Sequence, residues 1–419
     1  MDLLFLNRSY WPDVEATGQL LTELCSDLAR RHRVAVIAGR PNFVTAEQPV
    51  RWLQREEHQG VEILRVGNRT FSKRSFLGRV IGLLSYLVLA AWAAWRQRRP
   101  DVIIVETDPP VLGVLGAVLK RWHRCRLVYY LQDLYPEVGL IMGRLRPGLV
   151  TKLLYWATQV GLRQADRIIV LGEDMQRRVL ARGIDGRKLA IVPNWADAGA
   201  IRPVERHNAL RQSWNANGRL VVMYSGNHGL SQGLHHIVAA AKTLQTEPVE
   251  FIFVGEGAAK ADLMAQAQGL KHVRFLPYQP KERLAESLGA ADVHLIPLQK
   301  GLAGCIVPSK LYGILAAGRP YIAAVDADSE VAEVTRRAQS GVCIEPDAPA
   351  RLVEAIRWGV EHSEELNAMG ERGRRLAEEE FDRPVCVAAF EAALRACSPS
   401  PNPFLARGEG LLGQTLKSA

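Results

Sequence analysis

Short apolar runs alternate with amphipathic segments along almost the whole chain. Runs such as 3–6, 102–105 and 293–297 have the length of buried strands, and segments such as 17–31 and 234–245 carry apolar residues at helical spacing. Strands that alternate with helices build a parallel sheet with helices on both faces. The pattern therefore predicts an α/β fold of the doubly wound, Rossmann-like kind.

The alternation is interrupted once, at 193–197 and in the polar stretch 202–217, before a second series of strands and helices begins. A chain of 419 residues is also longer than one hydrophobic core usually holds. We therefore predict two Rossmann-like domains that face a central cleft, where ligands bind at the carboxyl ends of the strands. The predicted units are a first domain over 1–197, a second domain over 198–381, a helix over 382–397 that returns to the first domain, and a disordered tail over 398–419.

The net charge of +9 is concentrated in one region. Between Arg65 and Arg126 there are twelve lysines and arginines against three acids, and the rest of the chain is neutral. A basic block of this kind binds nucleic acid or anionic lipid. Because it surrounds the strongly apolar segment 76–95, we expect an anionic membrane surface as the partner of 65–126, and no nucleic acid.

The segment 76–95 has two interpretations. Its length would just cross a bilayer, but the strands before and after it belong to one sheet and must stay on one side. It is therefore either a buried crossover helix or a helix that lies in the plane of the membrane surface. Its flanks favour the second interpretation, because basic residues stand on both sides of it and two tryptophans lie near its end: Lys73, Arg74, Arg79, Arg96, Arg98 and Arg99, with Trp92 and Trp95.

Cysteine usage and the N-terminus indicate a protein that faces the cytosol. The six cysteines are scattered without the spacing of a zinc site or a disulfide framework. The first residues are not typical of a signal peptide, because Asp2 stands where a basic residue is expected.

The pair Asp326 and Asp328 precedes Ser329 and fits a helix cap better than a metal site. We expect neither a metal nor another cofactor.

Three loops marked by glycine or proline stand in the second half, each where an apolar run stops and a helical pattern begins: 224–233, 305–310 and 316–320. Loops of this kind expose backbone N–H groups at the start of a helix, where phosphate binds well. Three of them in one domain predict a pocket for a nucleotide diphosphate. A fourth motif, Val254-Gly-Glu-Gly257, is more typical of a tight turn between a strand and a helix.

Further motifs follow one another along the chain: Tyr10-Trp-Pro-Asp13 with Thr17-Gly18, Gln132-Asp-Leu-Tyr-Pro-Glu137, Val192-Pro-Asn194, Gly226-Asn-His-Gly229 with Gln232-Gly233, and Val307-Pro-Ser-Lys310 with Leu315-Ala-Ala-Gly-Arg-Pro320. In their order and spacing they resemble the motifs of the retaining glycosyltransferases of family 4, which have the two-domain GT-B fold, and the resemblance extends over about 3–394. It is closest to the bacterial subgroup that builds exopolysaccharide and O-antigen repeat units, the colanic-acid-type and N-acetylfucosaminyl-type transferases.

The resemblance implies a nucleotide diphosphate sugar, a UDP-sugar by expectation, as the donor. Lys310 is the cation placed to bind its phosphates, although an ordinary surface lysine is the alternative. His228 ranks lower, because a single histidine is usually structural. The loop that ends at Tyr278 resembles the one that holds the base. The donor-binding residues implied in this way are Thr17, Gly18, Asn227, His228, Gly229, Gln232, Leu276, Tyr278, Val307, Ser309 and Lys310.

Three carboxylates are the candidates for catalysis: Asp133, Glu137 and Glu173. Asp133 follows an apolar strand at the end that faces the cleft, where a carboxylate can accept the proton of an acceptor hydroxyl or orient the sugar. It could equally cap the helix that follows. Glu173 stands at a similar strand end, and we expect it to contact the donor sugar. Glu106 and Asp108 also end a strand, but the two prolines after them favour a turn.

The chain departs from the family at two positions. Most members carry two glutamates eight positions apart, which align here with Cys305 and Gly313, and the second glutamate usually binds the ribose. This departure favours a non-catalytic sugar-nucleotide-binding protein as one alternative, and a sugar-nucleotide 2-epimerase with the GT-B fold is another. The expected function is sugar transfer to a polyprenyl-diphosphate-linked or saccharide acceptor in bacterial cell-surface polysaccharide biosynthesis. The expected location is cytoplasmic and peripheral, on the inner face of the plasma membrane.

Overall fold

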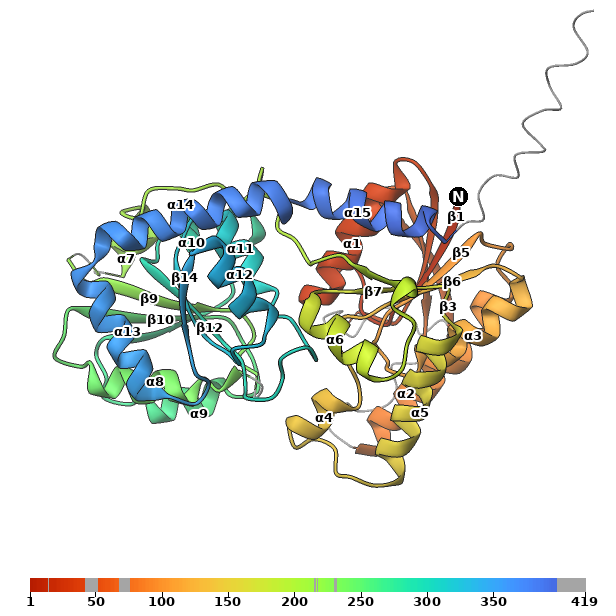
Figure 1. The fold of residues 1–419 in the computed structure, drawn as a ribbon, viewed down its shortest axis with the longest axis horizontal. Helices are drawn as coiled ribbons and strands as arrows, with labels where there is room; N and C mark the ends of the chain where they lie inside the picture. Colours follow the sequence, from red (N-terminus) through yellow and green to blue (C-terminus); the bar gives the residue numbers. More distant parts are fainter. Residues whose placement is uncertain are drawn as a thin grey trace, which may run out of the picture.

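The computed structural model describes residues 1–397 except 14, 42–51, 68–75, 215, 217, 230 and 231, and for 76–80 it describes the backbone alone. The predicted tail, 398–419, therefore lies outside the described residues. The chain forms two doubly wound α/β domains, each with its own sheet (Figure 1). The predicted fold class is confirmed.

The first sheet has the strand order β3-β4-β2-β1-β5-β6-β7-β8. All neighbouring strands are parallel except β3, which pairs with β4 as an antiparallel hairpin at the edge. The central strand β5 is buried along its whole length, as strands covered on both faces must be. The strands are β1 (Asp2–Leu6), β2 (Arg33–Ala38), β3 (Leu53–His58), β4 (Val61–Val66), β5 (Val102–Val105), β6 (Arg126–Tyr130), β7 (Arg167–Val170) and β8 (Leu189–Ile191).

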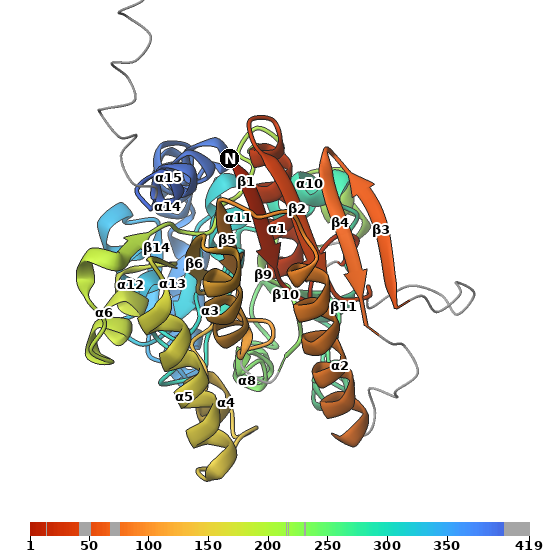
Figure 2. The same ribbon diagram turned by 90° about the vertical axis from the view of Figure 1, so that its right-hand side faces the viewer.

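Helices cover both faces of the first sheet (Figures 1 and 2). α1 (Ala16–Ala29) and α15 (Arg383–Arg395) lie on one face, and α2 (Phe76–Trp95), α3 (Leu112–His123) and α5 (Leu149–Gln164) lie on the other. Two shorter helices follow the strands nearest the cleft: α4 (Glu137–Ile141) comes after β6, and α6 (Glu173–Ala181) comes after β7.

The second sheet is parallel throughout and has the order β11-β10-β9-β12-β13-β14. Its strands are β9 (Leu220–Ser225), β10 (Val249–Val254), β11 (Val273–Leu276), β12 (Val293–Pro297), β13 (Tyr321–Ala324) and β14 (Gly341–Ile344). One face carries α8 (His235–Thr243), α9 (Lys260–Gln266) and α13 (Pro349–Glu361) (Figure 1). The other face carries α10 (Leu284–Gly289), α11 (Lys310–Ala316), α12 (Glu330–Ala338) and α14 (Ser363–Glu380).

The chain crosses between the domains at two places that touch each other. The backbone of Ala196, after β8, accepts a hydrogen bond from the N–H of Arg383 at 3.0 Å, and its own N–H donates to the carbonyl of Phe381 at 3.1 Å. α14 and α15 run in succession along one side of both domains (Figure 1). On the first domain the Phe390 ring of α15 packs 5.1 Å from the Tyr130 ring. The last helix is thereby part of the core of the first domain.

Candidate active site

One loop of the second domain reaches across to the first. It runs from the end of β12 to the start of α11, and within it Ile306 forms an antiparallel bridge with Asp133, which follows β6. The Leu134 N–H also donates to the Cys305 carbonyl at 2.8 Å. We call 298–309 the crossing loop. It pairs Asp133, a carboxylate predicted on the acceptor side, with Ile306, the residue before Val307, which was predicted on the donor side.

Asp133 has the environment of a general base. Its backbone N–H donates to the Thr107 hydroxyl at 3.2 Å, and its side chain is half-buried. Burial, with a smaller contribution from the charge of Asp108, raises the pKa of Asp133 to about 6, which leaves it mostly ionised at pH 7 and close to the value that suits proton abstraction. It does not cap α4, whose N-terminal flanking residue is Pro136, so the capping interpretation is wrong.

A second carboxyl lies close to this site inside the first domain. Glu106 is 1% exposed, and neither of its oxygens has a hydrogen-bond partner among the described residues. Burial first, and then the charges of Asp108 and Asp133, raise the pKa of Glu106 well above its ordinary value, which favours its neutral form. Asp108 pairs with Arg8 at 3.0 Å and accepts a hydrogen bond from the Ser9 hydroxyl at 3.1 Å, which fits the predicted turn.

The other two catalytic candidates differ from Asp133 in their surroundings. Glu137 forms an ion pair with Arg182, which also donates to the Tyr135 carbonyl at 3.0 Å. This pairing favours a role in holding the segment after β6. Glu173 begins α6 with a side chain that is 65% exposed, and its backbone N–H donates to a carboxylate oxygen of Glu330 at 2.8 Å.

Glu330, which begins α12 directly after Ser329, also belongs to this region. Burial, as the largest cause, raises its pKa to about 7. Ser329 does cap α12, since its hydroxyl accepts from the Ala332 N–H at 3.3 Å. The position of Glu330 at the start of a helix after β13 was the available signal, but its partners in the first domain are not visible in the sequence.

Lys310 points into the turn that follows β9. Its ammonium donates to the side-chain oxygen of Gln232 at 2.9 Å and lies 5.0 Å from the centre of the Tyr224 ring. Burial lowers the pKa of Lys310 to about 8, so it is still mostly charged at pH 7. It is therefore not an ordinary surface lysine. A half-buried cation next to a turn of exposed backbone is suited to bind an anion.

Glycines after β10 allow this turn to pack closely. A Cβ on Gly255 would lie 2.0 Å from the Gly226 carbonyl oxygen, and one on Gly257 would lie 2.5 Å from that of His228. Their φ angles, +139° and +157°, are also ones that other residues rarely adopt. The motif acts as the tight turn that the sequence predicted, and it supports the neighbouring loop.

His228 forms part of the wall behind the turn. It is fully buried, and its ring packs 5.7 Å from the Tyr224 ring and about at right angles to Phe253 and Phe275. Burial lowers its pKa to about 4, so the ring is neutral. Within the described residues neither ring nitrogen has a partner. These contacts favour the structural role that the sequence analysis ranked first for a single histidine.

The remaining donor candidates lie on several elements of both domains. Asn227 is exposed, and its carbonyl accepts from the Tyr224 hydroxyl at 2.7 Å. Gly229 follows in the same loop, Leu276 ends β11, and Tyr278 is half-exposed behind Gly255. Val307 is buried at the bridge, and Ser309 precedes α11. Thr17 and Gly18 lie in the first domain, in the first turn of α1, and Gly18 packs against the backbone of Tyr10.

The two positions that lack glutamate remain uncharged in the structure. Cys305 is fully buried beside the bridge, and burial raises the pKa of its thiol to about 11. Gly313 lies in α11, where an added Cβ would meet only Leu288 within 4 Å. Neither position supplies an acidic side chain that could bind a ribose.

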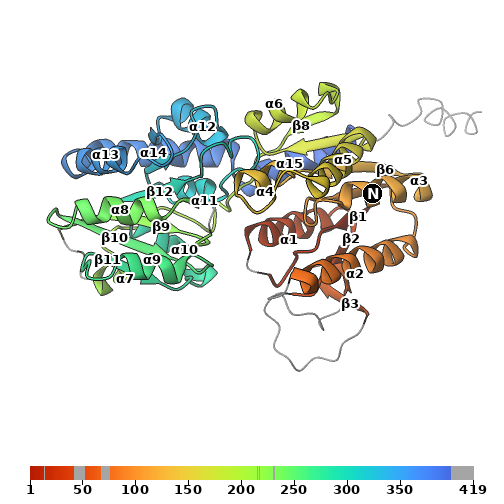
Figure 3. The same ribbon diagram turned by 90° about the horizontal axis from the view of Figure 1, so that it is seen from below.

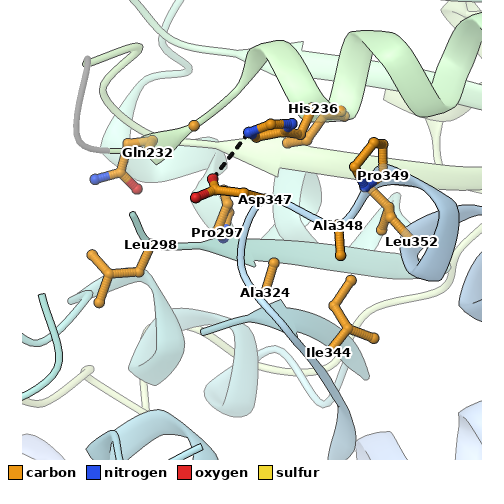
Figure 4. A pocket seen from close by; sticks show the side chains of 12 residues that line it. Gln232, His236, Pro297, Leu298, Ala324, Ile344, Asp347, Ala348, Pro349 and Leu352 are labelled. Carbon is orange, nitrogen blue, oxygen red and sulfur yellow. Dashed lines mark ion pairs between the residues drawn. The ribbon is translucent and has the colours of Figure 1, made fainter. Parts of the chain in front are cut away.

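A small, mostly apolar pocket borders the turn at the carboxyl ends of β12, β13 and β14 (Figure 4). His236 and Asp347 close one side of it through an ion pair of 2.9 Å. Gln232 lines the pocket and also holds Lys310. Within the described residues there is no group of three or more metal-ligating side chains, and Asp326 accepts a hydrogen bond from the Gly301 N–H at 2.7 Å.

Two domains arranged in this way have the GT-B architecture, and comparison with known proteins agrees. The family model described as "Glycosyl transferase 4-like domain" matches residues 16–195, and the one described as "Glycosyl transferases group 1" matches residues 206–376. Together they match more than half of the chain. The chain belongs to the family 4 glycosyltransferases, related to enzymes of colanic acid and lipopolysaccharide biosynthesis.

Relatives extend over most of the chain. The "Putative colanic acid biosynthesis glycosyl transferase WcaI" of Escherichia coli is 28% identical over 372 residues, which is 85% of this chain and 91% of that protein. The "Probable glycosyltransferase WbjE" of Pseudomonas aeruginosa is also 28% identical, over 72% of this chain and 76% of that protein.

Solved structures share the fold at lower identity. Anabaena HepE in complex with UDP superposes with a TM-score of 0.70 at 17% identity, over 94% of this chain and 100% of that one. WaaG, a glycosyltransferase of lipopolysaccharide biosynthesis, gives a TM-score of 0.67 at 17% identity, over 93% of this chain and 98% of that one.

Proposed function

We propose that this glycosyltransferase moves a sugar from a UDP-linked donor, with retention of configuration, to a polyprenyl-diphosphate-linked or saccharide acceptor in bacterial cell-surface polysaccharide biosynthesis. The observation that carries the proposal is the crossing loop, which joins Asp133 of the first domain to the segment that leads to Lys310. The colanic acid relative supports the pathway, and the complex of HepE with UDP supports the nucleotide.

The residues divide the chemistry between the domains. Lys310 and the backbone of 227–229 bind the diphosphate and stabilise its charge as it leaves, without a metal. Asp133 accepts the proton of the acceptor hydroxyl from the opposite wall, and the leaving diphosphate assists as the retaining mechanism implies. A cleft closed by the crossing loop limits the access of water to the donor. An epimerase acts on its own donor without an acceptor, so the requirement for an acceptor distinguishes the two activities.

A nucleotide panel tests the donor site. We expect UDP to raise the unfolding temperature more than GDP, ADP or dTDP do. A ligand at one hundred times its dissociation constant stabilises by about 2.7 kcal/mol, which corresponds to roughly 2–4 °C for a chain of this size. A selective shift with another nucleotide would contradict the UDP assignment. No shift with any of them would favour a protein whose nucleotide site has lost its function at Cys305 and Gly313.

The second part of the proposal is a peripheral location on the inner, cytoplasmic face of the plasma membrane. α2, α3 and α5 lie side by side (Figure 2). α2 buries Tyr86, Ala90 and Ala94, while its opposite side exposes large apolar residues at helical spacing. We call the exposed apolar side chains of the three helices the apolar face: Ile81, Leu84, Val88, Trp92, Trp95, Val118, Trp122, Leu149, Val150, Leu153 and Trp156.

The helices that carry the apolar face contact one another, and the face has a basic neighbour. The rings of Trp95 and Trp122 lie 5.5 Å apart and join α2 to α3, and α3 meets α5 where Gly113 and Gly161 pack closely. Arg96 lies 5.1 Å from the centre of the Trp92 ring. Tryptophan and arginine together suit the interface of an anionic membrane. The face extends beyond the predicted 65–126 to α5, whereas Lys73 and Arg74 lie outside the described residues.

Among the described residues, no helix has both the length and the apolar character that a membrane span requires.

Replacing Trp92, Trp122 and Trp156 together by serine is expected to abolish binding to phosphatidylglycerol vesicles at low salt. Burial of a large apolar side chain contributes about 1.5–3 kcal/mol, so each tryptophan accounts for roughly tenfold or more in affinity. Trp52→Ser is the matched control, because Trp52 is an exposed tryptophan outside this face. Vesicle flotation measures the binding. Equal binding by the triple variant, or no binding by the wild type, would contradict the membrane location.

A further inference from the structure

One side of α6 faces the second domain. Asp174 and Arg178 lie four positions apart on this helix, and both make contacts across the cleft. Figures 1 and 3 show α6 of the first domain beside α12 of the second. Neither residue was singled out by the sequence, and neither has a role in the reaction as described so far.

Asp174 is 4% exposed and accepts three backbone hydrogen bonds. One carboxylate oxygen accepts from the N–H of Met175, its own neighbour, at 2.6 Å. The other oxygen accepts two N–H groups of the second domain, from Gly304 at 2.8 Å and from Glu330 at 2.9 Å. A single carboxylate oxygen therefore joins the crossing loop and the start of α12 to the first domain.

Arg178 completes this contact from the next turn of α6. Its guanidinium donates to the Ala303 carbonyl at 2.6 Å and to the Gly301 carbonyl at 3.0 Å. The loop can approach α6 only because position 304 is glycine, since a Cβ there would lie 2.6 Å from the Asp174 carbonyl oxygen. We call Asp174, Arg178 and their partners at 301–304 and 330 the interdomain clasp.

The clasp holds the crossing loop immediately before its functional part. After Gly304 come Cys305 and Ile306, which pair with the segment at Asp133, and then the residues that lead to Lys310. Displacement of Gly304 would displace this pairing. The first half of the loop is thus held by α6, and the second half carries the residues proposed for the donor.

We propose that Asp174 is a positioning residue that couples closure of the two domains to assembly of the donor site. Both of its cross-domain donors belong to the second domain, so these two bonds exist only when the domains are together. Hydrogen bonds to a charged group are roughly twice as strong as neutral ones, so the loss of these two bonds should have a measurable effect. The proposal deepens the proposed function and rests on it for the catalytic consequence.

The variants that test the clasp are Asp174→Ala and Asp174→Asn. Alanine removes both cross-domain bonds, whereas asparagine keeps one oxygen that can turn toward Gly304 and Glu330. Asp166→Ala is the matched control, because Asp166 accepts from the Leu127 N–H at 2.8 Å and pairs with Lys120, all within the first domain. Loss of Asp166 therefore removes a structural carboxylate without changing the contact between the domains.

Hydrogen exchange and kinetics give two separate readouts. In Asp174→Ala we expect the Gly304 and Glu330 amides to exchange at least about tenfold faster, and the exchange of the β10 amides to be unchanged. We also expect kcat to fall about tenfold for each hydrogen bond lost. Asp174→Asn should recover part of both effects, and Asp166→Ala should show neither.

Unchanged exchange at Gly304 and Glu330 in Asp174→Ala would overturn the proposal, and so would an equal loss of kcat in Asp166→Ala. The exchange measurement needs no substrate. If the wild type transfers no sugar, the proposed function fails, and faster exchange at these two amides would still support the clasp.

Discussion

Asp133→Asn is expected to lower kcat by about 10²- to 10⁴-fold, the usual contribution of a general base. Asparagine has the size of aspartate and keeps the backbone bridge to Ile306, but it cannot accept a proton. The affinity for UDP should stay unchanged, because Asp133 belongs to the acceptor side. Steady-state kinetics with a fixed acceptor measure the first effect, and calorimetry with UDP measures the second.

The pH dependence of kcat/KM tests the role of Asp133 as the base. Asp133 must be ionised to act, so kcat/KM should rise as the pH rises through about 6. Lys310 must be charged to bind the diphosphate, so kcat/KM should fall as the pH rises through about 8. The acidic limb should disappear in Asp133→Asn and persist in Asp185→Asn, an exposed control. A variant that keeps both kcat and the acidic limb would show that Asp133 is not the base.

Lys310→Met is expected to weaken UDP binding by about 10- to 100-fold. A hydrogen bond to a charged group contributes about 1.5–3 kcal/mol, and each 1.4 kcal/mol changes affinity tenfold. Methionine keeps an apolar stem next to Tyr224 but removes the ammonium that lies 2.9 Å from Gln232. Titration calorimetry with UDP measures the change, and Lys242→Met, on the exposed side of α8, is the control.

The same variant separates loss of binding from loss of fold. Burial lowers the pKa of Lys310 to about 8. At pH 7 the lysine is charged in the folded protein, and this charge lowers the free energy of unfolding. Removing the charge therefore should not lower the unfolding temperature of the free protein at pH 7. Wild-type affinity in Lys310→Met would contradict the donor site. Weak binding together with a large loss of stability would show that the lysine is structural.

Most of the fold could be predicted because apolar runs mark buried parallel strands. The predicted strands at 102–105 and 293–297 have the bounds found in the structure. β3 was not predicted, because its sequence Leu-Gln-Arg-Glu-Glu-His is mostly polar, as an edge strand in a hairpin can be. β14, also at an edge, was missed for a different reason: its sequence Gly-Val-Cys-Ile is apolar, but it is only four residues long and begins with glycine.

The site was predictable where its chemistry is local. Glycine and proline mark the turns around Gly226 and Lys310, and the end of an apolar strand marks Asp133. Contacts between distant segments could not be predicted. Glu137 seemed equivalent to Asp133 in the sequence, and only the structure shows its pairing with Arg182. Asp174 meets Gly304 and Glu330, which are 130 and 156 positions away, through the packing of one domain on the other.

The apolar face also could not be predicted in full from the sequence. The helical patterns of α2, α3 and α5 are evident in the sequence, but which side of each helix is exposed depends on how they pack on the sheet. The basic flanks of 76–95 favoured a helix that lies in the plane of the membrane surface. The contribution of α5 depends on the close approach of Gly113 and Gly161, which no local pattern reveals.

Sugar transfer from UDP-sugars to a lipid extract of bacterial membranes tests the central claim most directly. The wild-type protein, Asp133→Asn and Lys310→Met would each be incubated with labelled UDP-sugars, and both UDP release and label in the lipid fraction would be measured. We predict that the wild type releases UDP from one donor only when the extract is present, with equal label in the lipid, and that both variants fail. UDP release without the extract, or isomerised donor without any transfer, would contradict the account.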